Sequence, residues 1–384
     1  MQLNRMLEEV PFSPFEDLER RIAARGMVDL FRLHQGKTTF GPTVRPAVRE
    51  PGAFPLQAHE HAPPGGVLAL RRRIAEHLQG QGSPVDVEDV VVSGGSTQAI
   101  SVVLHAVLQP GDDVLILSPQ WLFAVGLVAA AGGRPVEVPV FLELGRDPKF
   151  DFIAALEARV GPRTRALYFN TPNNPTGYSL SRDQLARLAA FAARHDLWII
   201  SDNAYENYDF TEAGFVDIAQ LRDAASRTFS VYSFSKTHAM PGQRVGYIAA
   251  PAGLGPRLRK WSLFSIYSLN TESQAIAYDA LAVDRGELRR RRGLARDARD
   301  RATRLEIPAI HPDGGLYSFL DLSAWRGGDV TGFIDACLGA GVTVAPGVAF
   351  GAHCKQFARL CFTAVAFDDL PRALERLERV YRAA

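Results

Sequence analysis

The sequence predicts an α/β protein in which a large domain, built on a mostly parallel seven-stranded sheet covered by helices, is joined to a smaller α+β domain. Two observations support this fold class. Seven short apolar runs between residues 89 and 249 are separated by turns and helical stretches, and such unbroken strands are typical of a parallel sheet buried on both faces. After Pro251 the pattern changes to long helices and then to a few separate strands.

The seven apolar runs are the predicted strands of the large sheet. They lie at residues 89–92, 113–117, 135–140, 166–169, 197–201, 228–232 and 245–249. A helix is expected at 97–108 after a glycine-rich turn, and a second helix through 128–131 ends at the pair Gly132-Gly133. No fixed-period repeat is present, which sets solenoids and propellers aside.

The stretch from 285 to 304 holds nine arginines against three acids. It can be interpreted as a nucleic-acid-binding arm or as a solvated helix. Leucines and alanines recur through it at helical spacing, which favours a connecting helix with one apolar face. Strands are then expected at 315–320, 342–344 and 358–362, before a last helix at 370–381.

These elements divide the chain into two predicted domains. Residues 46–284 form the large domain, and residues 1–45 with 285–384 form the small one. A chain of 384 residues is long enough to bury two cores of this kind.

The charge balance argues against partners that are chosen by bulk charge. Forty-three basic and forty-two acidic residues leave a net charge of +1, so no global field attracts nucleic acid or anionic lipid. No stretch approaches the roughly 20 apolar residues that a membrane span requires. We therefore expect no nucleic-acid partner and no membrane insertion.

The cysteines and the N-terminus point to a cytoplasmic protein. Cys337, Cys354 and Cys361 show no CxxC spacing, which argues against a disulfide framework and against a metal site. The first fourteen residues lack the basic and apolar regions of a secretory signal.

Lys236 is the first candidate for chemistry. It follows the apolar run 228–232 and precedes Pro241-Gly242, so it is predicted at the end of a strand and not on a solvated helix face. A nucleophilic amine would be held at such a position.

Asp202 directly follows the strand predicted at 197–201. In an open α/β sheet, ligands bind at the C-terminal ends of the strands. A carboxylate there could pair with a positive ring nitrogen, as pyridoxal phosphate requires. The alternative is an aspartate that caps a turn.

Asn174 and Tyr205 are candidates for binding a phenolate-like oxygen. Asn174 stands in the turn Asn173-Asn174-Pro175-Thr176-Gly177, and Tyr205 follows Asp202 by three residues. Hydrogen bonds to an ionised oxygen lower its pKa and that of a conjugated imine. Taken alone, the first motif is only a turn.

A phosphate cradle is predicted where the first strand of the sheet meets the first helix. Backbone N–H groups of Gly95, Ser96 and Thr97 at a helix N-terminus can bind an anion. Ser233, Ser235 and Arg244 could complete the site. Neither GxGxxG nor GxxxxGK[ST] occurs, which disfavours dinucleotides and nucleoside triphosphates, and an ordinary N-cap is the alternative.

For two further side chains, a ligand-binding role and a purely structural role are both possible. Trp121 follows a predicted strand end and could stack on a flat cofactor, although a core tryptophan is the commoner case. Arg359 is the one charge in an apolar strand and needs an anionic partner. That partner could be a substrate α-carboxylate or an internal acid.

In this order, the motifs resemble those of fold-type I pyridoxal-phosphate enzymes, in the class I/II aminotransferase family that includes aspartate aminotransferase. The series is Asn174-Pro175-Thr176-Gly177, then Asp202-x-x-Tyr205, then Ser233-Phe234-Ser235-Lys236 with Arg244 eight residues on. The resemblance runs from about Leu33 to the C-terminus.

The resemblance implies a role for each candidate. Lys236 would bind pyridoxal 5'-phosphate as a Schiff base and carry the proton, with Asp202 and Tyr205 as its catalytic partners. The other cofactor contacts would be Gly95, Ser96, Thr97, Trp121, Asn174, Ser233, Ser235, Arg244 and, where many relatives have tyrosine, His61 of a neighbouring subunit. Substrate would be bound by Arg359, Asn174 and the backbone of Gly36.

The implied activity is the ping-pong transfer of an α-amino group from an amino acid to a 2-oxo acid in a homodimer with shared active sites. A lyase or cyclase of the same fold is the alternative, because His61 could protonate a leaving group. A non-enzymatic regulator is disfavoured by the presence of both Lys236 and Asp202. Specificity would come from pocket walls that include Phe15, Phe40, Tyr267 and Asn270.

Overall fold

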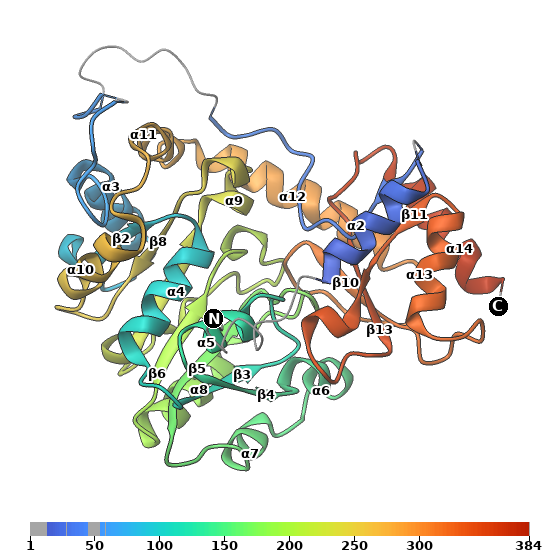
Figure 1. The fold of residues 1–384 in the computed structure, drawn as a ribbon, viewed down its shortest axis with the longest axis horizontal. Coiled ribbons are helices and arrows are strands. Elements are labelled where there is room, and N and C mark those ends of the chain that lie inside the picture. Colours follow the sequence, from blue (N-terminus) through green and yellow to red (C-terminus); the bar gives the residue numbers. More distant parts are fainter. Residues whose placement is uncertain (1–13, 28, 45–53, 58, 384) are drawn as a thin grey trace, which may run out of the picture.

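The computed structural model describes residues 14–27, 29–44, 54–57 and 59–383 (Figure 1). Its larger sheet has seven strands in the order β2-β8-β7-β6-β5-β3-β4. These strands are β2 (Val90–Ser93), β3 (Asp113–Leu117), β4 (Arg134–Val138), β5 (Thr164–Asn170), β6 (Trp198–Asp202), β7 (Thr228–Ser233) and β8 (Gly246–Ala249). The pairs β3–β4, β3–β5, β5–β6 and β6–β7 are parallel, and only the two pairs that involve β8 are antiparallel. The predicted mostly parallel, seven-stranded sheet is confirmed.

Helices cover both faces of this sheet because alternate strand residues point to opposite sides. In β3, Val114 and Ile116 pack with the helices α4, α5 and α10, whereas Leu115 and Leu117 pack with α6, α7 and α8. The helices of this part of the chain are α3 (Leu68–Gln79), α4 (Ser96–Val107), α5 (Ala124–Ala130), α6 (Val140–Arg146), α7 (Phe152–Glu157), α8 (Arg182–Arg194), α9 (Phe234–Thr237), α10 (Gly255–Ile266) and α11 (Thr271–Ala280).

The predicted strand 135–140 is shorter in the structure. It ends at Val138, and Val140 begins α6. Pro139 has no N–H to donate to a neighbouring strand, so the ladder stops there and the residue serves as the N-cap of the helix.

The remaining elements come from both ends of the chain and surround a four-stranded antiparallel sheet of order β12-β13-β10-β9. Its elements are α2 (Pro14–Ala24), β1 (Phe31–Arg32), α12 (Arg285–Ala302), β9 (Ala309–Ile310), β10 (Tyr317–Asp321), α13 (Val330–Gly339), β11 (Val342–Thr343), β12 (Ala345–Pro346), β13 (Phe357–Cys361) and α14 (Leu370–Arg382). The short strand β1 pairs in parallel with β11.

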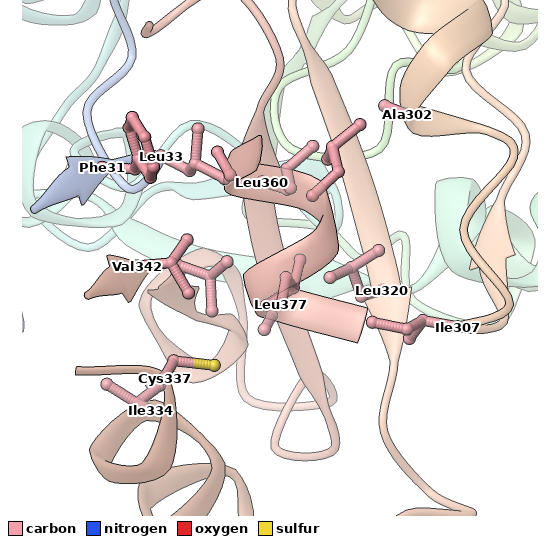
Figure 2. Close-up of a cluster of buried hydrophobic side chains, with 14 of the residues drawn as sticks. Phe31, Leu33, Ala302, Ile307, Leu320, Ile334, Cys337, Val342, Leu360 and Leu377 are labelled. Carbon is pink, nitrogen blue, oxygen red and sulfur yellow. The ribbon is translucent and has the colours of Figure 1, made fainter. Parts of the chain in front are cut away.

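One face of the small sheet packs on an apolar core, part of which is drawn in Figure 2. Leu360 of β13 and Leu320 of β10 meet Leu377 of α14 there, beside Cys337 of α13. Arg359 directly precedes Leu360 in β13, so strand alternation turns the Arg359 side chain to the other face of the sheet.

The arginine-rich stretch forms the predicted helix, α12, which contacts β10 and α14 on one side and the turn after β6 on the other (Figure 1). Its stripe of Ala295, Ala298 and Ala302 is buried, as the helical spacing predicts. Even Arg291 is buried and forms an ion pair with Glu287, one turn earlier. The apolar face of this helix is therefore used in packing.

Candidate active site

Lys236 lies in α9, immediately after the C-terminal end of β7. Ser233 caps this short helix by accepting a hydrogen bond from the backbone N–H of Ser235 at 3.1 Å. The amine of Lys236 donates to the backbone oxygen of Gly36, and burial lowers its pKa to about 8. Within the described residues no acid forms an ion pair with it, so a large share of the amine is neutral near pH 8.

Asp202 is the last residue of β6 and is buried. Its carboxylate accepts hydrogen bonds from the hydroxyl of Tyr168 at 3.2 Å and from the N–H of Ala204 at 3.1 Å. Burial raises its pKa to about 6 against these hydrogen bonds. No described cation pairs with it, so the carboxylate can still accept a positive partner.

Asn174 connects two groups of the candidate site. Its Nδ2 donates to the Tyr205 hydroxyl at 3.3 Å, and its Oδ1 accepts from Nη1 of Arg359 at 2.9 Å. All three side chains are buried. The turn that holds Asn174 follows β5, and Tyr205 follows the neighbouring strand β6. The two side chains therefore come from adjacent strand ends.

The predicted phosphate cradle lies at the N-terminus of α4. Gly95 precedes the helix with a φ of 84°, a conformation that glycine adopts without strain. A Cβ on Gly95 would lie 2.6 Å from Nη2 of Arg244, so the guanidinium closes over the turn that leads to Ser96 and Thr97. The free N–H groups of a helix start and a nearby exposed cation together favour an anion.

Arg359 is buried in β13, with 2% of its surface exposed, yet it forms no ion pair with any described residue. Besides Asn174, it donates from Nη2 to the backbone oxygen of His34 at 2.6 Å. Its Nε has no hydrogen-bond partner in the described part of the chain. A buried guanidinium without an acid is costly, so the internal salt bridge that was the alternative for Arg359 finds no described partner.

Trp121 and His61 stand apart from this hydrogen-bond network. Trp121 is partly buried after β3, and its ring meets that of Phe123 edge-on at 5.1 Å. His61 is exposed, and its ring meets that of Tyr267 at 5.3 Å. Neither donates a hydrogen bond to the other described candidates, so their predicted cofactor contacts remain predictions.

Tyr317 also belongs to this group of buried polar side chains, although no sequence motif points to it. Its hydroxyl lies 2.7 Å from that of Tyr205, and the Cζ of Arg359 lies 4.4 Å from its ring centroid. A Cβ on Gly36 would lie 2.6 Å from the Tyr317 hydroxyl. The strand containing Tyr317 was predicted, but one tyrosine among the other apolar residues carried no signal of its own.

The sequence matches the family described as aminotransferase class I and II over residues 32–377. The chain belongs to this family. It is 37% identical over 302 residues to the arginine–pyruvate transaminase of Pseudomonas aeruginosa, a match that covers 77% of this chain and 76% of the relative. It is 32% identical to an aspartate aminotransferase of Pyrococcus abyssi, covering 94% and 93% of the two chains.

Solved structures agree with the sequence comparison. The aspartate aminotransferase of Thermus thermophilus with maleate is 30% identical, with a TM-score of 0.87 over 99% of this chain and 100% of that one. The protein thus has the fold of type I pyridoxal-phosphate enzymes and is a pyridoxal-phosphate-dependent aminotransferase. Membership in this family favours amino transfer over the lyase or cyclase alternative.

The residues present fit pyridoxal phosphate. Asp202 is a buried carboxylate without a described cation, which suits a pyridinium nitrogen, and the guanidinium of Arg244 lies against the helix start at Gly95, which suits a phosphate. The described residues include no group of three or more histidines, cysteines or acids placed to hold a metal ion. No described helix combines the length and the hydropathy that crossing a membrane requires.

Proposed function

We propose that this aminotransferase moves an α-amino group between an amino acid and a 2-oxo acid, with Lys236 as the cofactor-binding amine and the carrier of the proton. The observation that carries this assignment is the position of Lys236 next to a substrate clamp. Its amine is bonded to Gly36, and Gly36 lies against Tyr317, whose ring contacts the guanidinium of Arg359. An amine here would reach the α-carbon of a substrate held by Arg359.

Lys236 is suited to both tasks by its lowered pKa of about 8. The neutral amine is the nucleophile, and an amine whose pKa lies near working pH can accept and return a proton. Bound pyridoxal phosphate supplies an electron sink for the charge left on the substrate. Lys236 then removes the proton from the substrate α-carbon at its Nζ.

Arg359 is proposed to bind the α-carboxylate of both substrates. Amino acid and oxo acid share this group, so one clamp serves both halves of a ping-pong reaction. Its five N–H donors make one hydrogen bond to Asn174 and one to the backbone oxygen of His34, and Nε has no described partner, so donors remain for two carboxylate oxygens. The backbone of Gly36 is proposed as a further contact of the same carboxylate.

The remaining candidates are proposed as cofactor ligands. Asp202 would pair with the protonated ring nitrogen, and Asn174 and Tyr205 would donate to the ring oxygen. The phosphate would be bound by Ser96, Thr97 and Gly95 of the helix start, together with Ser233, Ser235 and Arg244. Trp121 would stack on the ring.

A spectral half-reaction tests this proposal. Purified protein with pyridoxal phosphate should be coloured, and adding an amino acid without any oxo acid should convert the absorbance to that of the amine form of the cofactor. The Lys236→Ala variant should lose turnover by about 10⁴-fold, because both nucleophile and base are removed. Lys149→Ala, an exposed lysine, is the matched control. A colourless protein, or equal loss in both variants, would refute the proposal.

We further propose that the enzyme is a homodimer whose partner covers an apolar surface beside the phosphate cradle. Phe264, Ile266 and Tyr267 at the end of α10 are 76%, 37% and 56% exposed. This end of α10 lies against the start of α4, since Ser265 accepts a hydrogen bond from Gln98 and Ile266 contacts Gly94. Exposed apolar side chains gathered in this way mark interaction surfaces.

The partner would also place its own His61 near this cradle. Phe264→Glu should then give a monomer by light scattering and weaken cofactor binding, because the charge has to be buried at the interface. Val348→Glu, at a residue 53% exposed in the small sheet region, is the control and should stay dimeric. A dimer in both variants places the interface elsewhere.

The substrate side chain is best approached through the relatives. Their names specify arginine, aspartate, prephenate and aromatic amino acids. We propose only that the substrate is an α-amino acid, since Arg359 recognises the part that all of these share. A screen of amino acids by the spectral half-reaction would identify the preferred one.

A further inference from the structure

Tyr317 is a buried residue in β10 that the roles above do not use. Its hydroxyl meets the Tyr205 hydroxyl at 2.7 Å, and the two rings meet edge-on at 5.5 Å. Its strand partner is Cys361, two residues beyond Arg359, so the tyrosine and the arginine lie on the same face of the small sheet. The tyrosine therefore contacts both the proposed ring-oxygen ligand and the proposed carboxylate clamp.

The orientation of Asn174 determines what Tyr205 can do. A guanidinium only donates hydrogen bonds, so the atom of Asn174 that faces Arg359 must be Oδ1. The Nδ2 group then donates to the Tyr205 hydroxyl. Tyr205 thus already accepts one hydrogen bond, and its own proton must go either to Tyr317 or elsewhere.

Counting protons favours one direction for the bond between the two hydroxyls. If Tyr205 donated to Tyr317, the Tyr317 proton would be buried against Gly36 with no acceptor among the described residues. A buried donor without an acceptor destabilises the folded protein. If Tyr317 donates instead, the Tyr205 proton is free to meet a ring oxygen of the cofactor.

We propose that Tyr317 is a positioning residue that donates its proton to Tyr205 and so directs the Tyr205 proton to the ring oxygen of pyridoxal phosphate. This inference rests on the proposed roles of Lys236 and Tyr205. A hydroxyl that accepts a hydrogen bond is a stronger donor, so Tyr317 also strengthens the bond that Tyr205 makes.

The test is a pH titration of the absorbance of the holoenzyme without substrate. A hydrogen bond to the ionised ring oxygen lowers the pKa of the imine that Lys236 forms. Tyr317→Phe keeps the ring against Arg359 but removes the proton donor, so we expect the midpoint to rise by about half a unit. An unchanged or lowered midpoint overturns the proposal, because a Tyr205 that had been donating to Tyr317 would be released to the cofactor.

A double-mutant cycle tests whether Tyr317 acts through Tyr205. Tyr205→Phe alone should raise the midpoint more, and adding Tyr317→Phe should then change nothing. A shift that persists in the Tyr205→Phe background overturns the proposal. Tyr178→Phe, which loses only a bond with Gln184, controls for the removal of a tyrosine hydroxyl and should leave the midpoint unchanged.

Two more variants separate the hydroxyl from the ring. Gly36→Ala should displace the Tyr317 hydroxyl and raise the midpoint, but not in a Tyr317→Phe background; a rise there counts against the proposal. Tyr317→Leu should also raise KM for amino acid and oxo acid alike, whereas Tyr317→Phe keeps KM within about twofold, since the cation–π contact is retained. A wild-type protein that forms no coloured complex would refute the proposed function and the role of Tyr317 with it, whereas a coloured wild type with an unshifted Tyr317→Phe variant would refute the role of Tyr317 alone.

Discussion

The two sheets contribute different halves of the candidate site, and they do so from different positions in their strands. The parallel sheet offers residues at its C-terminal strand ends, as in Lys236 after β7 and Asp202 at the end of β6. The antiparallel sheet offers residues from within its strands, Arg359 in β13 and Tyr317 in β10. The proposed cofactor ligands Lys236 and Asp202 thus lie at strand ends, whereas the proposed substrate clamp Arg359 lies within a strand of the small sheet.

This difference follows from how each kind of sheet is packed. The parallel sheet is covered on both faces, so only its edge can bind a ligand. The small sheet packs one face on its apolar core and turns the other face, with Arg359, toward Asn174 of the large sheet. Each half can therefore be changed separately, which the following variants use.

Among variants that break one half alone, the largest effect is expected in the substrate half. Arg359→Lys keeps the charge but loses the planar pair of donors, so kcat/KM for both amino acid and oxo acid should fall by about 10²–10³-fold. The effect should appear mainly in KM. Cofactor absorbance and affinity should stay unchanged, because the strand-end groups are intact.

Arg376→Lys provides the matched control for this variant. Arg376 forms an ion pair with Asp29 at 2.6 Å on the far side of the small sheet. Steady-state kinetics on both variants, with both substrates varied, would check the expectation. Equal losses in the two variants, or loss of cofactor from Arg359→Lys, would mean that the two halves are not separable.

The same contrast explains which parts were predictable from the sequence. Lys236, Asp202 and Asn174 stand where an apolar run breaks into a turn, so each can be recognised as a strand end. Arg359 could be noticed as a charge inside an apolar strand. Tyr317 could not, because only tertiary structure brings its hydroxyl to Tyr205.

Other limits of the sequence have equally specific causes. The end of β4 depended on Pro139, which stops the ladder one residue after Val138. Whether Arg359 has an internal acid as its partner could be decided only from the positions of the acids in the structure. None of the described acids forms an ion pair with it. The proposed cofactor contact of His61 would be made by a second subunit, which a single chain does not contain.

A smaller effect is expected from the cofactor half, and it concerns stability. Burial raises the pKa of Asp202 from an ordinary 3.8 to about 6, so the cofactor-free protein should lose stability as pH rises through this window. The cost reaches about 3 kcal/mol at pH 8 and about half of that at pH 5. Cofactor-free Asp202→Asn should be more stable than the wild type by up to these amounts.

Urea unfolding of the cofactor-free proteins at both pH values would measure the difference. Asp217→Asn is the informative contrast, because the buried carboxylate of Asp217 accepts hydrogen bonds from the hydroxyls of Ser230 and Tyr232, and its replacement should destabilise the protein. With cofactor bound, Asp202→Asn should bind it more weakly. A variant no more stable than wild type at pH 8 would mean that Asp202 already has a partner.

The smallest effect sharpens the comparison at Lys236, where the two halves meet. Because only the neutral amine attacks, the rate at which pyridoxal phosphate binds to the cofactor-free protein should rise about tenfold per pH unit below the pKa of about 8 and level off above it. Stopped-flow absorbance from pH 6 to 10 would record this profile. The side chain of Nα-acetyl-lysine has an ordinary pKa near 10.4 and is the compound's only amine, so its reaction with the cofactor should keep rising beyond pH 9. If the protein followed this compound, burial would not be what prepares the amine of Lys236.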